Sequence, residues 1–155
     1  MEHFFLGYAL NAIDAKGRVS IPADFRAVVE RRSQASVIVL GPHPTADCLV
    51  AYDRSYSALL HQKLSVARDP ASDDWDQRSV IQFGLTEELA YDSTGRIALS
   101  KNLKSWGQLD TLGLFLGSSE TFEIWNPRVL LQRDGLNSRL AQLVRGLLAD
   151  RGEVE

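Results

Sequence analysis

The sequence predicts an α+β fold, mainly β, in which two tandem repeats share one core. Residues 14–18, Asp-Ala-Lys-Gly-Arg, recur at residues 92–96 as Asp-Ser-Thr-Gly-Arg, which is a shift of 78 residues. The same shift superimposes apolar positions: Ile13 on Tyr91, Val19 on Ile97, Ile21 on Leu99 and Phe25 on Leu103. A chain of 155 residues is long enough for one ordinary domain or two very small ones. The duplication therefore favours two halves packed around a common core.

The repeated motif specifies a tight turn. Asp14 and Asp92 stand at the first position, where a carboxylate hydrogen-bonds turn amides, and Gly17 and Gly95 stand at the fourth, where φ is positive. This pattern fits a hairpin with a type I turn and a glycine bulge. The alternative is acid–base catalysis by the aspartates. Neither aspartate has a second carboxylate or a histidine at a fixed spacing, so we favour the structural interpretation.

The first hairpin and a helix open the chain. Residues 4–13 and 18–21 are expected to be the two arms of the hairpin, because apolar residues alternate with polar ones. Pro22 suits the first position of a helix, where its missing amide is harmless. Phe25 and Val29 then follow at helical spacing, which places Arg26 largely on another face.

A second hairpin and a second helix complete the first half. Residues 37–40 form a short β-branched run, and a loop containing two prolines separates them from a strand at residues 48–52. Asp53 is a plausible N-cap for a helix with Tyr56 and three leucines on one face. The acidic stretch 69–74 is the natural boundary between the halves, and a shorter helix is expected over residues 75–83.

The second half repeats this order. Residues 87–91 and 96–99 flank the second turn, and Ser100, in place of the proline, is expected to be the N-cap of a helix that holds Leu103 and Trp106. A hairpin is expected at residues 112–116 and 122–125, and a helix from Asn126. An apolar stripe follows and either closes the fold or contacts a neighbouring subunit: Leu136, Leu140, Leu143, Val144 and Leu147. The chain thus divides into four parts: residues 5–52, 53–84, 85–126 and 127–155.

Composition restricts the classes of function. The formal net charge is −3, which argues against a globally basic nucleic-acid binder but allows a locally basic face. Cys48 is the single cysteine and lies in an apolar run, so a buried thiol is expected. No apolar stretch approaches the roughly 20 residues that span a bilayer, and the N-terminus lacks a basic signal region. We expect an intracellular protein without a membrane partner.

No motif indicates an enzyme or a cofactor. His3, His43 and His61 are scattered, without the spacing of a zinc or iron site. The sequence contains neither a glycine-rich phosphate loop nor a Gly-x-Ser-x-Gly motif. We therefore expect no catalytic residues, no metal and no cofactor.

Cations recur at fixed positions around the two turns. Lys16 and Arg18 belong to the first turn and Arg96 to the second, and the helix cation Arg26 recurs as Lys104. An arginine on a rigid hairpin can fork onto phosphate or guanine edges, as DNA recognition requires. One chain carries only a handful of such cations, so oligomerisation would have to supply the remaining contacts.

Three segments resemble the MraZ family: residues 5–7 (Phe-Leu-Gly), residues 13–22 (Ile-Asp-Ala-Lys-Gly-Arg-Val-Ser-Ile-Pro) and the second motif at residues 92–96. Each half is similar to the swapped-hairpin module of AbrB regulators. The resemblance implies a pseudo-two-fold double-split β-barrel with small helices, assembled into a ring-like homo-oligomer. It also implies a cytoplasmic, nucleoid-associated repressor that binds direct repeats in promoter DNA of the division and cell-wall gene cluster and controls its own gene.

The resemblance also implies roles for individual residues. Arg18 and Arg96 match the family's motif arginines, which makes them DNA-contacting candidates, with Lys16 beside the first. Arg26 and Lys104 match a cationic helix position of AbrB-type modules. The second motif departs from the family pattern at residue 100, where serine stands in place of the usual proline.

Two other functions stay open at this stage. An AbrB-like antitoxin would bind DNA and inhibit a toxin through a free tail, but no disordered C-terminal half is expected here. A ring-shaped adaptor would bind a partner enzyme and no DNA. Sequence-specific DNA binding separates the adaptor from the regulator, and capture of a partner by the tail identifies the antitoxin.

Overall fold

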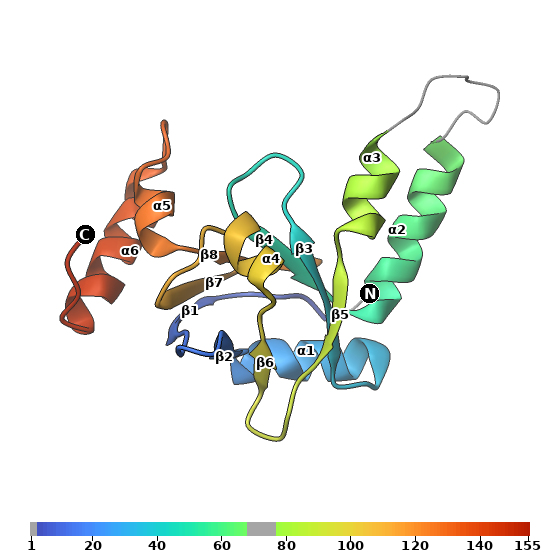
Figure 1. Cartoon of the computed structure of the whole chain (residues 1–155), viewed down its shortest axis with the longest axis horizontal. Coiled ribbons are helices and arrows are strands. Elements are labelled where there is room, and N and C mark those ends of the chain that lie inside the picture. The colour runs from blue at the N-terminus through green and yellow to red at the C-terminus, as the bar shows by residue number, and fades with distance from the viewer. Residues whose placement is uncertain (1–2, 68–76) are drawn as a thin grey trace.

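The fold was analysed in a computed structural model, which describes residues 3–67 and 77–155 (Figure 1). The strands are β1 (Tyr8–Ala12), β2 (Arg18–Ser20), β3 (Val37–Pro42), β4 (Leu49–Tyr52), β5 (Glu87–Ala90), β6 (Arg96–Ala98), β7 (Leu112–Ser118) and β8 (Thr121–Trp125). The helices are α1 (Ala23–Ser33), α2 (Arg54–Ala67), α3 (Gln77–Ser79), the π-helix η1 (Val80–Gly84), α4 (Lys101–Trp106), α5 (Pro127–Leu131) and α6 (Ser138–Asp150). All strand pairs are antiparallel, which confirms the α+β class.

Strands from the two halves of the chain are interleaved in one six-stranded sheet. Its order is β1-β7-β8-β4-β3-β5, and β2 and β6 form a separate two-stranded sheet. If each strand of the first half is exchanged with its counterpart in the second, this order simply reverses. The halves meet at the centre, where Leu49 lies opposite Ile124 and Ala51 opposite Phe122.

The arms of the first hairpin do not form a ladder with each other, contrary to the prediction. β1 pairs with β7, and β2 pairs with β6 from the other half. Two backbone bonds, from Asp14 N–H to the Arg18 carbonyl at 3.0 Å and from Gly17 N–H to the Asp14 carbonyl at 2.9 Å, still close the turn. The arms then part because β1 lies along the apolar strand β7, whereas β2 buries only Val19, which packs beside Ile97 of β6.

Most of the predicted helices are present, with shifted boundaries. Pro22 precedes α1 as its N-cap and is not its first residue. Ser100 caps α4, because its hydroxyl oxygen accepts from the Leu103 amide at 3.2 Å. The acidic stretch 69–74 lies outside the described residues. Of the helix expected over residues 75–83, the described part is helical and continues through η1.

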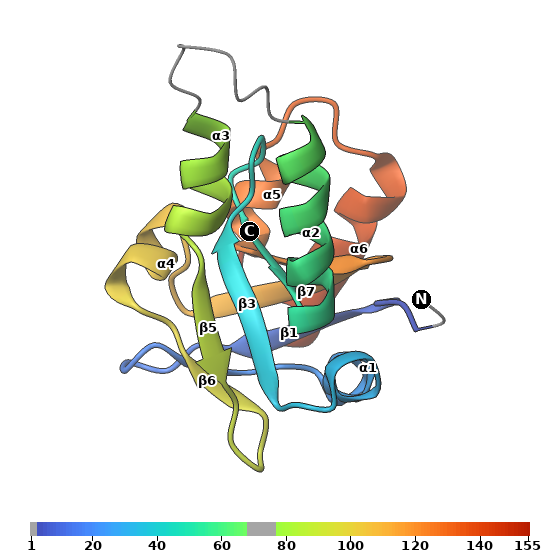
Figure 2. The ribbon, with the colours of Figure 1, turned by 90° about the vertical axis from the view of Figure 1, so that its right-hand side faces the viewer.

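Aromatic residues from both halves fill the main core. The rings of Phe5 and Phe25 each lie 4.9 Å from that of Phe122, and Phe115 completes the group. Phe5 comes from the N-terminal segment and Phe25 from α1, whereas Phe115 and Phe122 come from β7 and β8. The core therefore needs both halves. Figure 2 shows α2 and α3 side by side at one end of the sheet.

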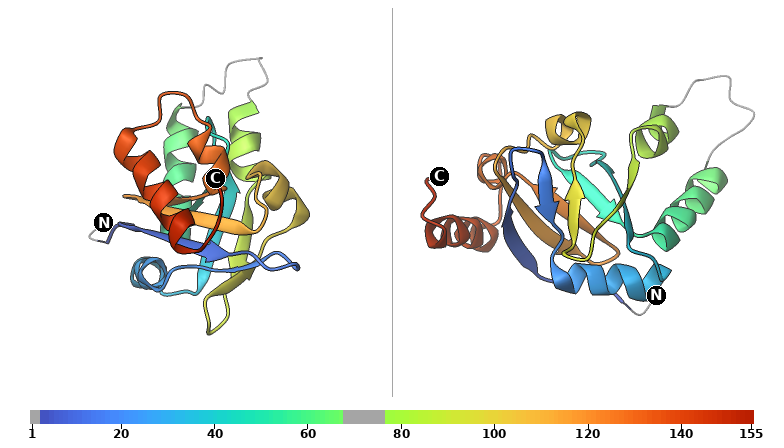
Figure 3. Two further views of the ribbon diagram at one scale, coloured as in Figure 1. Left: turned by 90° about the vertical axis from the view of Figure 1, so that its left-hand side faces the viewer. Right: turned by 60° about the horizontal axis from the view of Figure 1, so that its bottom comes forward.

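The C-terminal stripe closes the fold on the other side. Val144 and Leu148 of α6 are fully buried and pack with Leu114 and Trp125. Figure 3 shows α5 and α6 together on that side of the sheet. Cys48 lies in the same cluster and is fully buried, as predicted.

Candidate nucleic-acid interface

The two repeated turns have the same hydrogen-bond geometry. In the first, Asp14 Oδ1 accepts from the amides of Lys16 and Arg18 at 2.9 and 2.8 Å. Gly17 donates to the Asp14 carbonyl at 2.9 Å and has a φ of 79°. In the second, Asp92 Oδ1 accepts from the amides of Thr94 and Arg96, both at 3.0 Å, and Gly95 has a φ of 82°.

Each aspartate also holds the arginine of its own turn. Arg18 Nε lies 2.8 Å from Asp14 Oδ2, and Arg96 Nε lies 3.1 Å from Asp92 Oδ2. Hydrogen bonds from the backbone and side chain of Arg18 lower the pKa of Asp14. The hydroxyl of Thr94 and the amide of Arg96 lower the pKa of Asp92. Both carboxylates are therefore charged at neutral pH and fix the direction of the arginines.

The arginines lie on the outer face of one short ribbon, formed by β2 and β6. Arg18 lies opposite Ala98 and Ser20 opposite Arg96, so the two arginines are diagonal neighbours on one face. The central pair, Val19 and Ile97, points to the core and is buried. Within the described residues, the terminal guanidinium nitrogens of Arg18 and Arg96 make no hydrogen bond.

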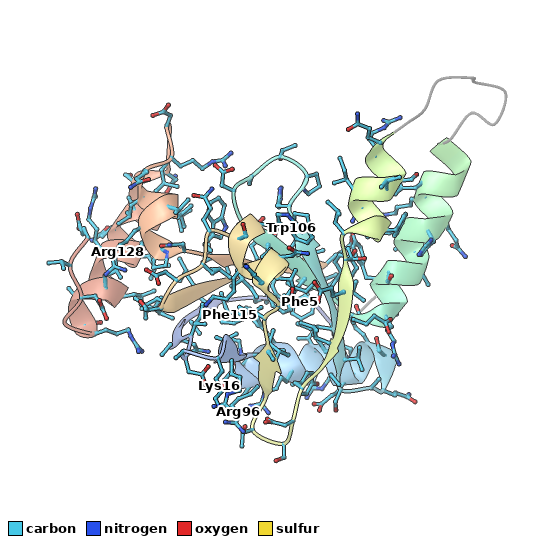
Figure 4. All side chains as sticks on the ribbon, viewed as in Figure 1. Phe5, Lys16, Arg96, Trp106, Phe115 and Arg128 are labelled. Atoms are coloured by element: carbon cyan, nitrogen blue, oxygen red, sulfur yellow. The ribbon has the colours of Figure 1, made fainter. Side chains whose placement is uncertain are left out.

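Backbone bonds join each turn to the other half of the chain. Leu99 N–H donates to the Gly17 carbonyl and Ile21 N–H to the Gly95 carbonyl, both at 2.8 Å. The turns consequently lie at opposite ends of the ribbon and cannot move independently of it. Figure 4 shows Lys16 and Arg96 on the same side of the molecule, away from α6 and α2.

The helix cations lie against the turn of the opposite half. Arg26 of α1 donates from Nε to the Ile21 carbonyl at 3.1 Å and lies over Gly95. Lys104 of α4 lies beside Gly17, where a Cβ atom would be 3.5 Å from its Cδ. All five cations predicted from the sequence are thus gathered around the β2–β6 ribbon.

Comparison with known proteins gives the same family as the sequence motifs, although no family model matches the chain. The chain is 35% identical to the transcriptional regulator MraZ of Gluconobacter oxydans over 131 residues, covering 83% of this chain and 79% of the relative. It is 37% identical to that of Beijerinckia indica over 125 residues, with coverage of 79% and 74%. It is 34% identical to the transcriptional regulator MraZ of Rickettsia canadensis over 124 residues, covering 80% of this chain and 82% of the relative. The chain belongs to the MraZ family.

Two site residues of this MraZ-family chain were missed in the sequence analysis. The Thr94 hydroxyl donates to Asp92 Oδ1 at 2.7 Å, and Asn11 Nδ2 donates to the Ser20 carbonyl at 2.7 Å, which ties β1 to β2. The threonine two residues after Asp92 is a recognisable Asx-turn signal. Asn11 gives no comparable signal, since its role depends on the separation of β1 from β2.

Other kinds of site receive no support in this MraZ-family chain. Among residues 3–67 and 77–155, no group of three histidine, cysteine, aspartate or glutamate side chains is placed to hold a metal ion. None of the described helices is long and apolar enough to cross a membrane.

Proposed function

We propose that the chain is a sequence-specific DNA-binding transcriptional regulator, a repressor that also controls its own gene. The observation that carries the proposal is the β2–β6 ribbon, which presents Arg18 and Arg96 on one exposed face. Each arginine is held at Nε by an aspartate of its own turn. The family's name, transcriptional regulator, supports the same conclusion.

The ribbon has the shape and chemistry that DNA recognition requires. A two-stranded β-ribbon fits the major groove, where an arginine can donate two hydrogen bonds to one guanine or to a phosphate. Anchoring at Nε leaves the two terminal nitrogens of Arg18 and Arg96 for such a pair of bonds. Lys16, exposed in the first turn, and Lys104 would contact phosphates.

The finer fold belongs to the same proposal. We infer a double-split β-barrel of two AbrB-like modules, residues 5–52 and 85–126, with helical segments at residues 53–84 and 127–155. The strand order, which reverses on exchange of the halves, supports this pseudo-two-fold arrangement. The cross-half pairing of β2 with β6 supports the interleaved hairpins.

A ring-like homo-oligomer would supply enough contacts for stable binding. One chain carries a net charge of −3 and few cations at the ribbon, so several ribbons on one DNA are needed. Tyr8 is 56% exposed and lines a groove of about 480 Å³ with Leu143 and Leu147 of α6. Val80, 48% exposed, begins η1 directly after α3, and α3 lies on the opposite side of the molecule from α6 (Figure 1). Contacts between two different surfaces of identical chains generate a ring when the rotation between neighbours closes.

Family membership supports the choice of target. A MraZ-type ring would bind direct repeats in the promoter of the division and cell-wall gene cluster, in the cytoplasm at the nucleoid. Of the alternatives, an antitoxin with a free C-terminal tail is disfavoured because α6 buries Val144 and Leu148.

The experiment is fluorescence anisotropy with promoter DNA and with a scrambled duplex at two salt concentrations. We expect specific, salt-sensitive binding that weakens at least about fivefold in Arg18→Ala, since a bidentate arginine contributes on the order of 1–3 kcal/mol. Arg145→Ala, which removes an equally charged residue of α6, is the matched control. Equal, weak binding to both duplexes that Arg18→Ala leaves unchanged would sink the proposal and favour the adaptor.

A further inference from the structure

Two hydrogen bonds connect Arg26 to the second turn through Ile21. Its Nε donates to the Ile21 carbonyl at 3.1 Å, and the Ile21 amide donates to the Gly95 carbonyl at 2.8 Å. Gly95 directly precedes Arg96, so a short chain of contacts leads from α1 of one half to the arginine of the other.

The Arg26 side chain also occupies the space above Gly95. A Cβ atom at residue 95 would lie 2.5 Å from Arg26 Nε, 2.7 Å from Cζ and 2.8 Å from Cδ. Such close approach is possible only to glycine, and it fixes both the guanidinium and the turn. The next residue, Arg96, is then held by Asp92 through its backbone amide and its Nε. The Arg26 side chain therefore lies against the backbone that directly precedes Arg96.

Lys104, the counterpart of Arg26 in the second half, makes a different contact. Its aliphatic stem leaves room above Gly17, since a Cβ atom added there would lie 3.5 Å from Lys104 Cδ, and within the described residues its ammonium group makes no hydrogen bond. The first turn is held without it, by the backbone bond from Leu99 to Gly17. The ammonium of Lys104 is therefore available for a ligand, whereas Arg26 is anchored to the fold through its Nε.

We propose that Arg26 is a positioning residue for Arg96, acting through Ile21 and Gly95, whereas Lys104 is a direct phosphate contact. This inference rests on the proposed function and refines it. It departs from the expectation, drawn from the family resemblance, that Arg26 itself contacts DNA. The two halves of one ribbon then use the same helix position in different ways.

Two substitutions of Arg26 distinguish a positioning role of its Nε donor from a DNA contact made by its charge. In Arg26→Gln, Nε2 takes the place of the arginine Nε, one bond beyond Cδ, so the donor to the Ile21 carbonyl is kept and the charge is lost. In Arg26→Lys, a methylene takes that place, so the charge is kept and the donor is lost. A positioning residue is rescued by glutamine, and a phosphate contact is rescued by lysine.

The first measurement uses the protein without DNA. Amide hydrogen exchange of Ile21 and Gly95 should become about threefold to tenfold faster in Arg26→Lys, the range expected for one lost hydrogen bond. It should stay within about twofold of wild type in Arg26→Gln. Amides of the β3–β4 ladder report global stability: they should be unchanged in Arg26→Gln, and in Arg26→Lys they should speed up no more than the turn amides, because global unfolding breaks the same hydrogen bond. Equal exchange of the turn amides in wild type and Arg26→Lys would overturn the positioning role.

The second measurement is promoter affinity. We expect Arg26→Lys to weaken binding about as much as Arg96→Ala, Arg26→Gln to bind nearly as wild type, and Arg26→Lys to have no further effect when Arg96 is already alanine. Lys104→Ala should weaken binding independently of Arg96 and reduce the slope of log K against log salt by about 0.9. If Arg26→Lys keeps the promoter affinity of wild type and Arg26→Gln loses it, Arg26 is a phosphate contact and not a positioning residue. If wild type binds no promoter DNA, the proposed function fails, and the exchange rates still decide whether Arg26 positions the turn.

Discussion

Arg32 and Asp53 form an ion pair in which both side chains are buried, with 3.2 Å between Nη1 and Oδ1. Arg32 also donates to the carbonyls of His3 and Glu120 at 2.7 and 2.8 Å, and Asp53 accepts from the hydroxyls of Ser33 and Ser55. This pair therefore joins the N-terminal segment, α1, the start of α2 and the β7–β8 turn. It lies at a junction of four segments that the sequence places far apart.

Removal of Arg32 should be strongly destabilising. Arg32→Ala leaves Asp53 charged and buried without its partner, for which we expect a loss of about 3–5 kcal/mol in the free energy of unfolding. Urea denaturation followed by circular dichroism measures it. Arg54→Ala is the control, because its pair with Glu88 is about half exposed and should contribute no more than about 1 kcal/mol. Similar losses in the two variants would contradict the central role of the buried pair.

Asp53 should make stability depend on acid pH. Burial raises the pKa of Asp53, but hydrogen bonds from Ser33, Ser55 and Arg32 outweigh it, and the pKa falls below the ordinary value of 3.8. As the pH falls, Asp53 is therefore protonated in the unfolded chain at a higher pH than in the folded chain. The stabilisation is fully present above about pH 4 and is lost as the pH falls through the lower folded-state pKa. Urea unfolding between pH 7 and pH 3 should show a shallower acid loss in Asp53→Asn than in wild type. Parallel curves would exclude Asp53 as a source of the acid sensitivity.

Gly17 should tolerate alanine less well than another glycine of the same backbone conformation. At Gly17, φ is 79° and a Cβ atom would lie 2.9 Å from the Leu99 carbonyl oxygen. At Gly135, φ is 72° and the space is open. Gly135→Ala should cost only the conformational strain, about 1–2 kcal/mol, and Gly17→Ala should cost more because backbone must also move. Thermal melting compares the two, and equal shifts would show that the turn yields to the added methyl group.

The sequence predicted the turns well because their information is local. Asp14 and Gly17 are the first and fourth residues of one turn, and the same chemistry recurs at Asp92 and Gly95, so both turns could be recognised without knowledge of the fold. Hairpin pairing was predicted wrongly for β1 and β2 because the choice between a neighbouring arm and a strand of the other half is not local. It depends on apolar burial along β7.

The candidate site was predictable in its residue types but not in its contacts. The recurrence of Arg26 as Lys104 indicated a cation near each turn. That Arg26 lies over Gly95, in the turn of the opposite half, follows only from the pairing of β2 with β6. The Arg32–Asp53 pair had no sequence signal, because Arg32 lies in α1, Asp53 lies just before α2, and neither belongs to the repeated turn motif.

Asp14 gives a prediction in which simple electrostatics and the structure disagree. Asp14→Ala removes a negative charge beside the proposed DNA surface, so net charge alone predicts tighter binding. The structure predicts weaker specific binding, because Asp14 holds Arg18 by its amide at 2.8 Å and by its Nε at 2.8 Å. We expect promoter affinity to fall about tenfold while binding to scrambled DNA is equal or slightly stronger. Asp134→Ala, which removes a charge from an exposed loop, should leave the ratio of the two affinities unchanged. Tighter binding of the promoter by Asp14→Ala would mean that Arg18 recognises its site without the hydrogen bonds to Asp14.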